Sequence, residues 1–349
     1  MRRSIDYLRG RPKFVWRMSI IFLAICIIMM CLGEWIVSLN TSAQIANDQF
    51  RMVVNNDITR LQNHFEYYAN TLYAGQSLFG VDNSVSRQDW SNFITAQHIT
   101  ARYPGVYGLG YISAVNAQNA PALLAKINSQ LRPNETPLTN FYPVEKNSNL
   151  AVVTYVAPDT ASQAGIGYNI LSDSNRAAAV NKATINGTPT ATAHVIHLQG
   201  DPLEQRSLII FLPIYNNQLP VTTPSQRQAA ILGYVDILLH VKTLLNEVFS
   251  TDTPNGSVAV RIQSSSENIY SFGTMNQSNT LKSSANVIVA GQSWHIVFDA
   301  TKNYGLTTAA IWLPRIILIS VIPILALCLM VLYLGFNYQA LKKQNLNTD

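Results

Sequence analysis

Side chains suited to catalysis or metal binding are sparse in this sequence. Of its six histidines only His194 and His197 lie close together, and their spacing on a strand turns them to opposite faces. Cys26, Cys31 and Cys328 fall in two apolar runs near the chain ends, which excludes a disulfide framework or a cysteine metal site in the middle. The sequence also lacks a phosphate-binding loop, a G-x-S-x-G motif and a kinase or cyclase signature. It therefore predicts no catalytic residue, no metal site and no cofactor, and it argues against a hydrolase.

The stretch Arg102–Val115 has a pattern that suits ligand binding. It opens with a Tyr-Pro-Gly turn signal and continues with β-branched and aromatic residues that favour a strand. Gly108 and Gly110 leave one face of that strand without side chains. A bare face suits either close packing of a helix or a floor for a ligand, and the residues alone leave both alternatives open.

Two apolar runs, residues 18–37 and 311–338, are long enough to cross a bilayer. The first is too long for the core of a signal peptide and lacks a clear cleavage site, so we expect an uncleaved anchor. Basic residues crowd the segment 1–17, and two lysines follow the second run in the tail 339–349. The positive-inside rule then predicts both termini in the cytoplasm and residues 38–306 outside it, in a protein of the inner membrane.

The net charge of +5 comes mainly from the basic N-terminal flank, and only 12% of the residues are charged. The middle of the chain has no basic stripe, which argues against a nucleic acid as partner. The lipid bilayer is the partner that this charge distribution predicts.

The region between the spans divides by pattern into three parts. Residues 38–84 carry apolar side chains at steps of three, four and seven, which predicts a long stalk helix able to pair with its copy in a homodimer. Residues 85–228 and 229–305 each mix helix and strand patterns, which predicts two α+β units, the smaller one next to the membrane. In the larger unit we expect strands at 102–115, 139–144, 150–157, 190–198 and 206–215, helices at 88–99, 120–130 and 173–185, and a loop at 216–228. In the smaller unit we expect strands at 229–235, 258–264, 269–273, 285–289 and 294–298 and a helix at 238–249.

A set of short motifs keeps one order and spacing over roughly residues 50–300. They are Leu78-Phe79, Val85-Ser86-Arg87 with Trp90, Arg102-Tyr103-Pro104-Gly105-Val106, Leu109-Gly110-Tyr111, Tyr142-Pro143-Val144, Gly167-Tyr168-Asn169, Asn175-Arg176, Phe211-Leu212-Pro213-Ile214-Tyr215, Leu232-Gly233-Tyr234-Val235 and Trp294. The ordered set resembles the CHASE domains, extracytoplasmic sensor domains of receptor histidine kinases and related membrane receptors, including cytokinin receptors. The resemblance implies an α+β protein with a long N-terminal helix followed by two tandem PAS-like domains, bracketed by two transmembrane helices.

The resemblance also implies that a small molecule binds in the membrane-distal unit, between its sheet and the covering loops. Asn169 stands where the cytokinin-receptor branch has a key aspartate, and an amide lacks the carboxylate's charge, which argues against cytokinin itself. Ala191 and Thr192 fall where the family lines its pocket. The predicted site is therefore Tyr107, Tyr111, Tyr155, Asn169, Ala191, Thr192 and Phe211. For the aromatic residues core packing is the alternative, and for Asn169 it is bracing of a turn.

The sequence thus predicts a membrane-anchored sensor that passes a signal across the bilayer. The chain ends eleven residues after the second span, so we expect the output, a kinase or a cyclic-dinucleotide enzyme, in a missing domain or in a cytoplasmic partner. The alternative is a structural or adaptor membrane protein whose middle region binds another protein. An enclosed cavity lined by Tyr111, Asn169 and Thr192 would favour the sensor, and an exposed, unfilled apolar surface on the larger unit would favour the adaptor.

Overall fold

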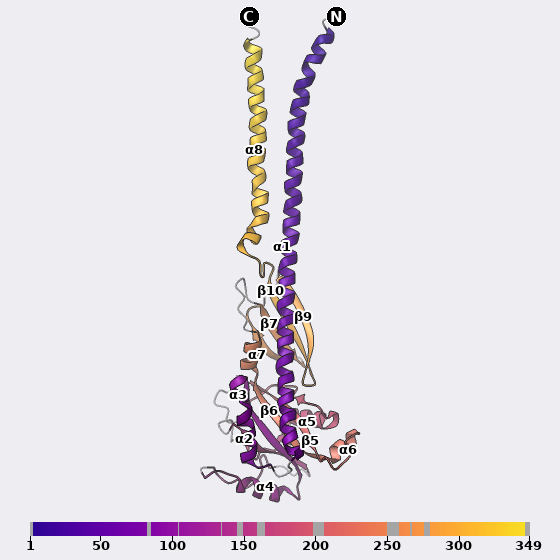
Figure 1. Ribbon diagram of the computed structural model, residues 1–349, viewed down its shortest axis with the longest axis vertical. Coiled ribbons are helices and arrows are strands. Elements are labelled where there is room, and N and C mark those ends of the chain that lie inside the picture. Colours follow the sequence, from indigo (N-terminus) through magenta and orange to yellow (C-terminus); the bar gives the residue numbers. More distant parts are fainter. Residues whose placement is uncertain are drawn as a thin grey trace. The chain divides into compact units, whose positions relative to one another are not determined.

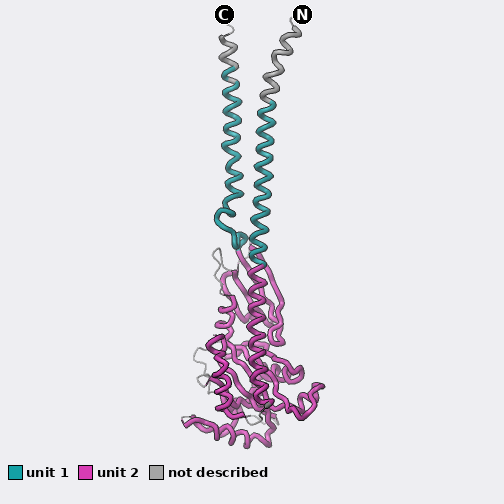
Figure 2. The backbone as a smooth tube through the Cα atoms, viewed as in Figure 1, with its two compact units in different colours: residues 1–51, 253–256, 301–349 teal, residues 52–252, 257–300 magenta. Residues whose placement is uncertain are grey.

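A computed structural model describes residues 3–81, 85–103, 105–133, 135–144, 149–158, 165–197, 206–249, 258–265, 267–275 and 280–345. The chain forms two compact units, which Figure 2 shows in different colours. The first unit contains both ends of the chain, Met1–Arg51 and Thr301–Asp349. The second unit contains most of the middle, Met52–Asp252 and Ser257–Ala300.

The first unit consists mainly of two long helices. Helix α1 (Arg3–Val81) begins in this unit and continues into the second, and helix α8 (Thr308–Asn345) runs beside its first part (Figure 1). The Ser42 hydroxyl donates a hydrogen bond to the Ala310 carbonyl oxygen at 3.4 Å. Both helices are long and apolar enough to cross a membrane, as the sequence predicted. The predicted stalk helix is confirmed up to Val81, and residues 82–84 lie outside the described part of the chain.

The second unit is built on two antiparallel sheets. The larger has six strands in the order β2-β1-β6-β5-β3, with β4 also paired to β5. Its strands are β1 (Val106–Asn116), β2 (Asn149–Ala157), β3 (Thr190–Ala191), β4 (Ile196–His197), β5 (Arg206–Tyr215) and β6 (Ile231–His240). The smaller has the order β8-β7-β10-β9, made of β7 (Ala259–Ser264), β8 (Glu267–Phe272), β9 (Thr280–Val289) and β10 (Gln292–Thr301).

Helix α1 packs along both sheets and serves as the spine of the second unit (Figure 1). On the larger sheet the ring of Phe79 stacks on Tyr111 with centroids 4.1 Å apart. On the smaller sheet Phe65 meets Trp294 edge to face at 5.5 Å. One helix therefore contacts the core of both sheets.

The remaining helices cover the larger sheet or link the two sheets. They are α2 (Arg87–Gln97), α3 (Ile99–Arg102), α4 (Ala120–Ser129), the short 3-10 turn η2 (Ile170–Ser172), α5 (Ser174–Asn186), α6 (Pro224–Ala229) and α7 (Val241–Phe249). Helix α5 buries Ala179, Val180 and Ala183 against Ile209 and Phe211 of β5, on the face opposite α1. The larger sheet is thus covered on both faces.

The α+β class is confirmed, and most predicted elements are present within a few residues. The start of α2 is as predicted, because the Ser86 hydroxyl accepts a hydrogen bond from the Asp89 backbone N–H and the Asp89 carboxylate accepts one from the Ser86 backbone N–H. The tandem PAS-like arrangement and the domain boundaries stay predictions.

Four local expectations were wrong. Residues 139–144 form no strand and contribute only a bridge from Tyr142 to Tyr168. The expected strand 190–198 is two short pieces, β3 and β4, and the expected loop 216–228 holds most of α6, whose capping box joins Thr223 and Gln226. The strand expected at 229–235 in the smaller unit is β6, which pairs with β1 and β5 in the larger sheet. Strand pairing is non-local, so the local pattern could identify this strand but not its sheet.

The seam between α1 and the larger sheet gives a testable prediction about packing. A Cβ added at Gly75 would lie 3.1 Å from Val235 and 3.2 Å from Trp90, whereas one added at Gly80 would meet nothing within 4 Å. Gly75→Leu should therefore lower the free energy of unfolding by about 1–3 kcal/mol because it overpacks the seam. Gly80→Leu is the matched control on the same helix and should have little effect. Thermal unfolding of the full chain in detergent measures both, and equal effects would contradict the packing described.

Candidate ligand-binding site

A cavity of about 300 Å³ lies between the larger sheet and the segment that leads into α5. Its lining combines apolar, aromatic and charged side chains, as small-molecule sites commonly do. The lining residues are Ile112, Tyr142, Val153, Val156, Gly165, Tyr168, Ile170, Asp173, Arg176, His197, Ile209, Phe211, Asp236 and Leu238. The larger sheet therefore carries a cavity, but Tyr111, Asn169 and Thr192, which the sensor hypothesis expected to line it, are not among its lining residues.

The bare face of β1 accommodates the carboxyl group of Asp236. Asp236 pairs with Gly110 on one side and with Phe211 on the other, in the middle of the sheet. A Cβ added at Gly110 would clash with the Oδ1 atom of Asp236. Gly110 is thus needed for this carboxyl to lie across β1, which itself contributes Ile112 to the cavity lining.

Asp236 is buried, with 5% of its surface exposed. Its Oδ1 atom has no hydrogen-bond partner among the described residues. Burial raises the pKa of Asp236 to about 7, and the nearby charge of Arg176 partly offsets this rise. The carboxyl group therefore changes its protonation state near neutral pH.

Arg176 supplies a positive charge to the same cavity. It lies in the first turn of α5, where its backbone N–H donates to the capping carboxylate of Asp173 at 2.8 Å. Its guanidinium carbon is 4.8 Å from the ring centre of Tyr168, a cation–π contact. Its buried Nε has no partner, and neither Arg176 nor Asp236 forms a salt bridge within the described part of the chain. Two opposite charges thus line one cavity without pairing with each other.

Of the seven residues predicted from the sequence, Phe211 lines this cavity and the other six do not. Tyr111 and Tyr155 lie on the opposite face of the sheet, where Tyr111 stacks on Phe79 and the Tyr155 hydroxyl donates to the Val85 carbonyl oxygen at 3.2 Å. The ring of Tyr107 stacks on His240, with centroids 4.6 Å apart. For these three tyrosines the structure has the packing role that was the alternative.

Asn169 lies beside the cavity and braces its wall. Its Oδ1 accepts hydrogen bonds from the backbone N–H groups of Ala151, at 3.2 Å, and Leu171, at 3.3 Å. These bonds cap η2 and tie it to β2, which places the flanking residues Tyr168 and Ile170 in the cavity wall. The Nδ2 atom of Asn169 is buried without a partner in the described residues.

Ala191 and Thr192 lie where the larger sheet meets the turn between β9 and β10. The Ala191 N–H donates to the carbonyl oxygen of Ala290 at 2.8 Å, and the Gln292 side chain donates to the Ala191 carbonyl oxygen at 2.7 Å. The Thr192 hydroxyl accepts from the backbone N–H of Ile209 at 3.4 Å. These residues connect the two sheets.

Sequence reasoning missed Asp236 and Arg176 as site residues, although signals for both were present. Asp236 is the single charged residue in the apolar run 231–239. A charge inside a buried strand marks a candidate functional residue. Arg176 and Tyr168 belong to the CHASE-like motifs Asn175-Arg176 and Gly167-Tyr168-Asn169, but the motifs alone did not indicate a role for either side chain.

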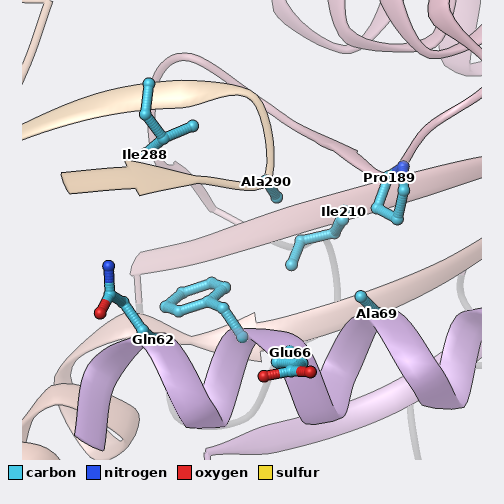
Figure 3. A pocket seen from close by; sticks show the side chains of 8 residues that line it. Gln62, Glu66, Ala69, Pro189, Ile210, Ile288 and Ala290 are labelled. Carbon is cyan, nitrogen blue, oxygen red and sulfur yellow. The ribbon is translucent and has the colours of Figure 1, made fainter. Parts of the chain in front are cut away.

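A second cavity, of about 250 Å³, lies where α1 meets β5 and the end of β9. Figure 3 shows Gln62, Glu66 and Ala69 on the helix, with Ile288 and Ala290 on the hairpin opposite. The charged side chain here, Glu66, is exposed. The first cavity, with its buried carboxyl, is therefore the better candidate site.

Comparison with known protein families identifies the family of the region that contains the cavity. The family profile of the CHASE domain matches residues 83–277, more than half of the chain. This chain belongs to the CHASE domain family. The matched region contains all residues that line the cavity. The two candidate membrane helices, α1 and α8, precede and follow this region in the sequence. The chain is thus a sensor domain of a membrane protein.

Two solved structures show what the chain is similar to. An extracellular ligand-binding receptor from Desulfohalobium retbaense shares 11% identity at a TM-score of 0.46 over 74% of this chain. The chain spans 40% of the length of that receptor. The periplasmic sensory domain of the Campylobacter jejuni chemoreceptor Tlp1 shares 8% identity at a TM-score of 0.39, over 78% of this chain and 100% of that domain. A comparison with curated proteins gave no match.

The raised pKa of Asp236 predicts a pH dependence of stability. Because its folded-state value, about 7, exceeds the ordinary value of 3.8, the carboxyl contributes stability that is full below about pH 4 and is lost as the pH rises through about 7. Asp236→Asn cannot ionise. From about pH 4 to about pH 8 the wild type should therefore lose up to roughly 4 kcal/mol relative to this variant.

Unfolding of both proteins across this pH range measures the difference. Asp57→Asn removes a second buried carboxyl, whose pKa burial raises to about 6, so this variant should also flatten the pH profile, by a smaller amount than Asp236→Asn. Parallel pH profiles for the wild type and Asp236→Asn would show that the carboxyl is not buried as described.

Proposed function

We propose that this CHASE protein is an extracytoplasmic sensor that binds a small molecule in the cavity lined by Asp236 and Arg176. The observation that carries the proposal is the carboxyl of Asp236, a buried residue that lines the cavity and whose Oδ1 has no hydrogen-bond partner among the described residues. Burying such a group costs folding free energy unless a partner compensates it. A ligand that hydrogen-bonds to Asp236 would supply that compensation.

The proposed membrane arrangement follows from the two apolar helices and the basic residues before the first. Both termini lie in the cytoplasm and the CHASE region lies outside the inner membrane. Helix α1 pairs with its copy in a homodimer, and the output is an attached enzyme domain or a cytoplasmic partner.

The proposed signal route leads from α5 to the turn between β9 and β10. Arg176 of α5 lines the cavity, and Lys182 of the same helix donates to the Gly291 carbonyl oxygen at 2.6 Å. The turn is also held by Gln292 through its bond to Ala191. A ligand that favours one position of α5 would therefore shift the populations of the conformations of the turn and of β10. Strand β10 is followed in the sequence by α8.

The adaptor hypothesis has less support. The sensor hypothesis expected a cavity lined by Tyr111, Asn169 and Thr192, and the structure has a cavity lined by other residues of the same sheet and its cover. A buried charge in a cavity is costly to leave unpaired, which favours a cavity that a small ligand completes.

Filling the cavity tests the binding site. Val153 of β2 is half-buried and lines the cavity, so Val153→Phe should occupy part of its volume and weaken ligand binding about tenfold or more. Thermal-shift screening of the full chain against adenine derivatives, amino acids and organic acids identifies stabilising compounds. Val221→Phe, at a loop position 37% exposed, is the control and should bind as the wild type does. Undiminished stabilisation of Val153→Phe would place the binding site elsewhere.

Hydrogen exchange tests the signal route. A compound that stabilises the wild type should change amide exchange in the 280–301 hairpin, and Lys182→Met should reduce this change because it removes the bond to Gly291. Lys126→Met on α4 is the control for loss of a surface lysine. An unchanged response in Lys182→Met would exclude this route.

A further inference from the structure

The two charges in the cavity constrain the chemistry of what binds there. We infer that the cavity takes a small zwitterion, with its cationic amine on Asp236, its carboxylate on Arg176 and its apolar part against Phe211. This inference rests on the proposed function, since it names the ligand class of the same cavity.

Asp236 is positioned to accept a hydrogen bond from a bound cation. It lies in the central strand β6, held between β1 and β5, so its carboxyl cannot turn out to solvent without disrupting the sheet. Its Oδ1 is buried and unpartnered among the described residues. An ammonium group in the cavity that Asp236 lines would donate to the carboxylate and neutralise its charge.

Arg176 is positioned to bind a carboxylate. Its guanidinium is oriented by the ring of Tyr168, and the planar fork of an arginine matches a carboxylate with two parallel hydrogen bonds. Its buried Nε lacks a partner in the described part of the chain. The neighbouring Asp173 carboxylate already caps α5 through the Arg176 backbone, so it does not replace a ligand at the guanidinium.

The charges of the lining favour a ligand with both signs. Besides Arg176, Asp236 and Asp173, the titratable residues of the lining are the exposed His197 and the two tyrosines, Tyr142 and Tyr168. A ligand with a single charge would leave either Arg176 or the buried Asp236 without a partner of opposite charge, which is costly for a buried group. A zwitterion compensates both at once.

The size of the cavity and its apolar walls narrow the class further. About 300 Å³ is at the small end of ligand sites, which suits a molecule of amino-acid size and not a nucleotide or a peptide. Ile112, Ile209 and Leu238 provide an apolar wall. An α-amino acid with an apolar side chain fits this combination.

The test titrates the full chain in detergent with the standard L-amino acids and follows thermal stability and binding heat. The amino acid that binds is then compared with its C-terminal amide, which lacks the anion, and its N-acetyl form, which lacks the cation. Each blocked form should bind about tenfold or more weakly, because each loses a charge-assisted hydrogen bond. Failure of every amino acid to bind, or equal binding of a blocked form, overturns the inference.

Variants of the chain provide the matching evidence. Asp236→Asn should weaken binding of the amino acid but should not further weaken binding of its N-acetyl form. Arg176→Gln should likewise weaken binding of the amino acid but should not further weaken binding of its amide. Asp57→Asn, at another buried carboxyl, and Arg227→Gln, on α6, are controls that should leave binding unchanged. If Asp236→Asn does not fold, the comparison of blocked and unblocked compounds on the wild type still decides the question.

The outcomes also separate this inference from the proposed function. Suppose that a singly charged or neutral compound binds the wild type and that Val153→Phe abolishes this binding. The proposal of a ligand-binding cavity then stands, and the inference of a zwitterionic ligand is overturned. An amino acid that binds Val153→Phe as tightly as the wild type overturns the cavity itself.

Discussion

The structure depends on a carboxyl group buried in the middle of a sheet. Asp236 lies on β6, the central strand, and its side chain fits only because Gly110 of β1 has no Cβ. The cost of burying this group appears as a pKa raised to about 7. A sequence that places such a group in its core trades stability for a site that a ligand can complete.

The rest of the CHASE region holds this site in a defined geometry. Helix α1 closes one face of the larger sheet with Phe79 and the smaller sheet with Phe65, which leaves the other face of the larger sheet for α5 and the cavity. Asn169 fixes the cavity wall through two backbone hydrogen bonds. Lys182 then ties the helix that carries Arg176 to the smaller sheet. In the proposed function, binding and transmission would thus share one helix.

Features with local causes could be predicted from the sequence. The long helix follows from its apolar spacing, and the starts of α2 and α5 follow from the capping residues Ser86 and Asp173. The family could be predicted because ordered motifs carry it. The bare face of β1 was also recognised, with its two alternative uses.

The composition of the site could not be predicted, because it depends on which face each strand residue takes. The pairing of β1 with β6 skips Tyr107, and its pairing with β2 shifts between Tyr111 and Ile112. Ile112 lines the cavity and Tyr111 stacks on Phe79, as neighbours on a strand take opposite faces, but this alternation does not say which of the two faces carries the cavity. The position of Asp236 beside Gly110 depends on a strand pair far apart in sequence, which no local signal specifies.

The central claim is that a ligand amine completes the buried carboxyl of Asp236, and proton release on binding tests it most directly. The measurement is the binding heat of a stabilising amino acid at pH 7 in buffers of different ionisation enthalpy. We predict net proton release by the wild type, because the bound cation lowers the pKa of a carboxyl whose pKa burial raises to about 7, and no release by Asp236→Asn. Equal proton release by both proteins would contradict it.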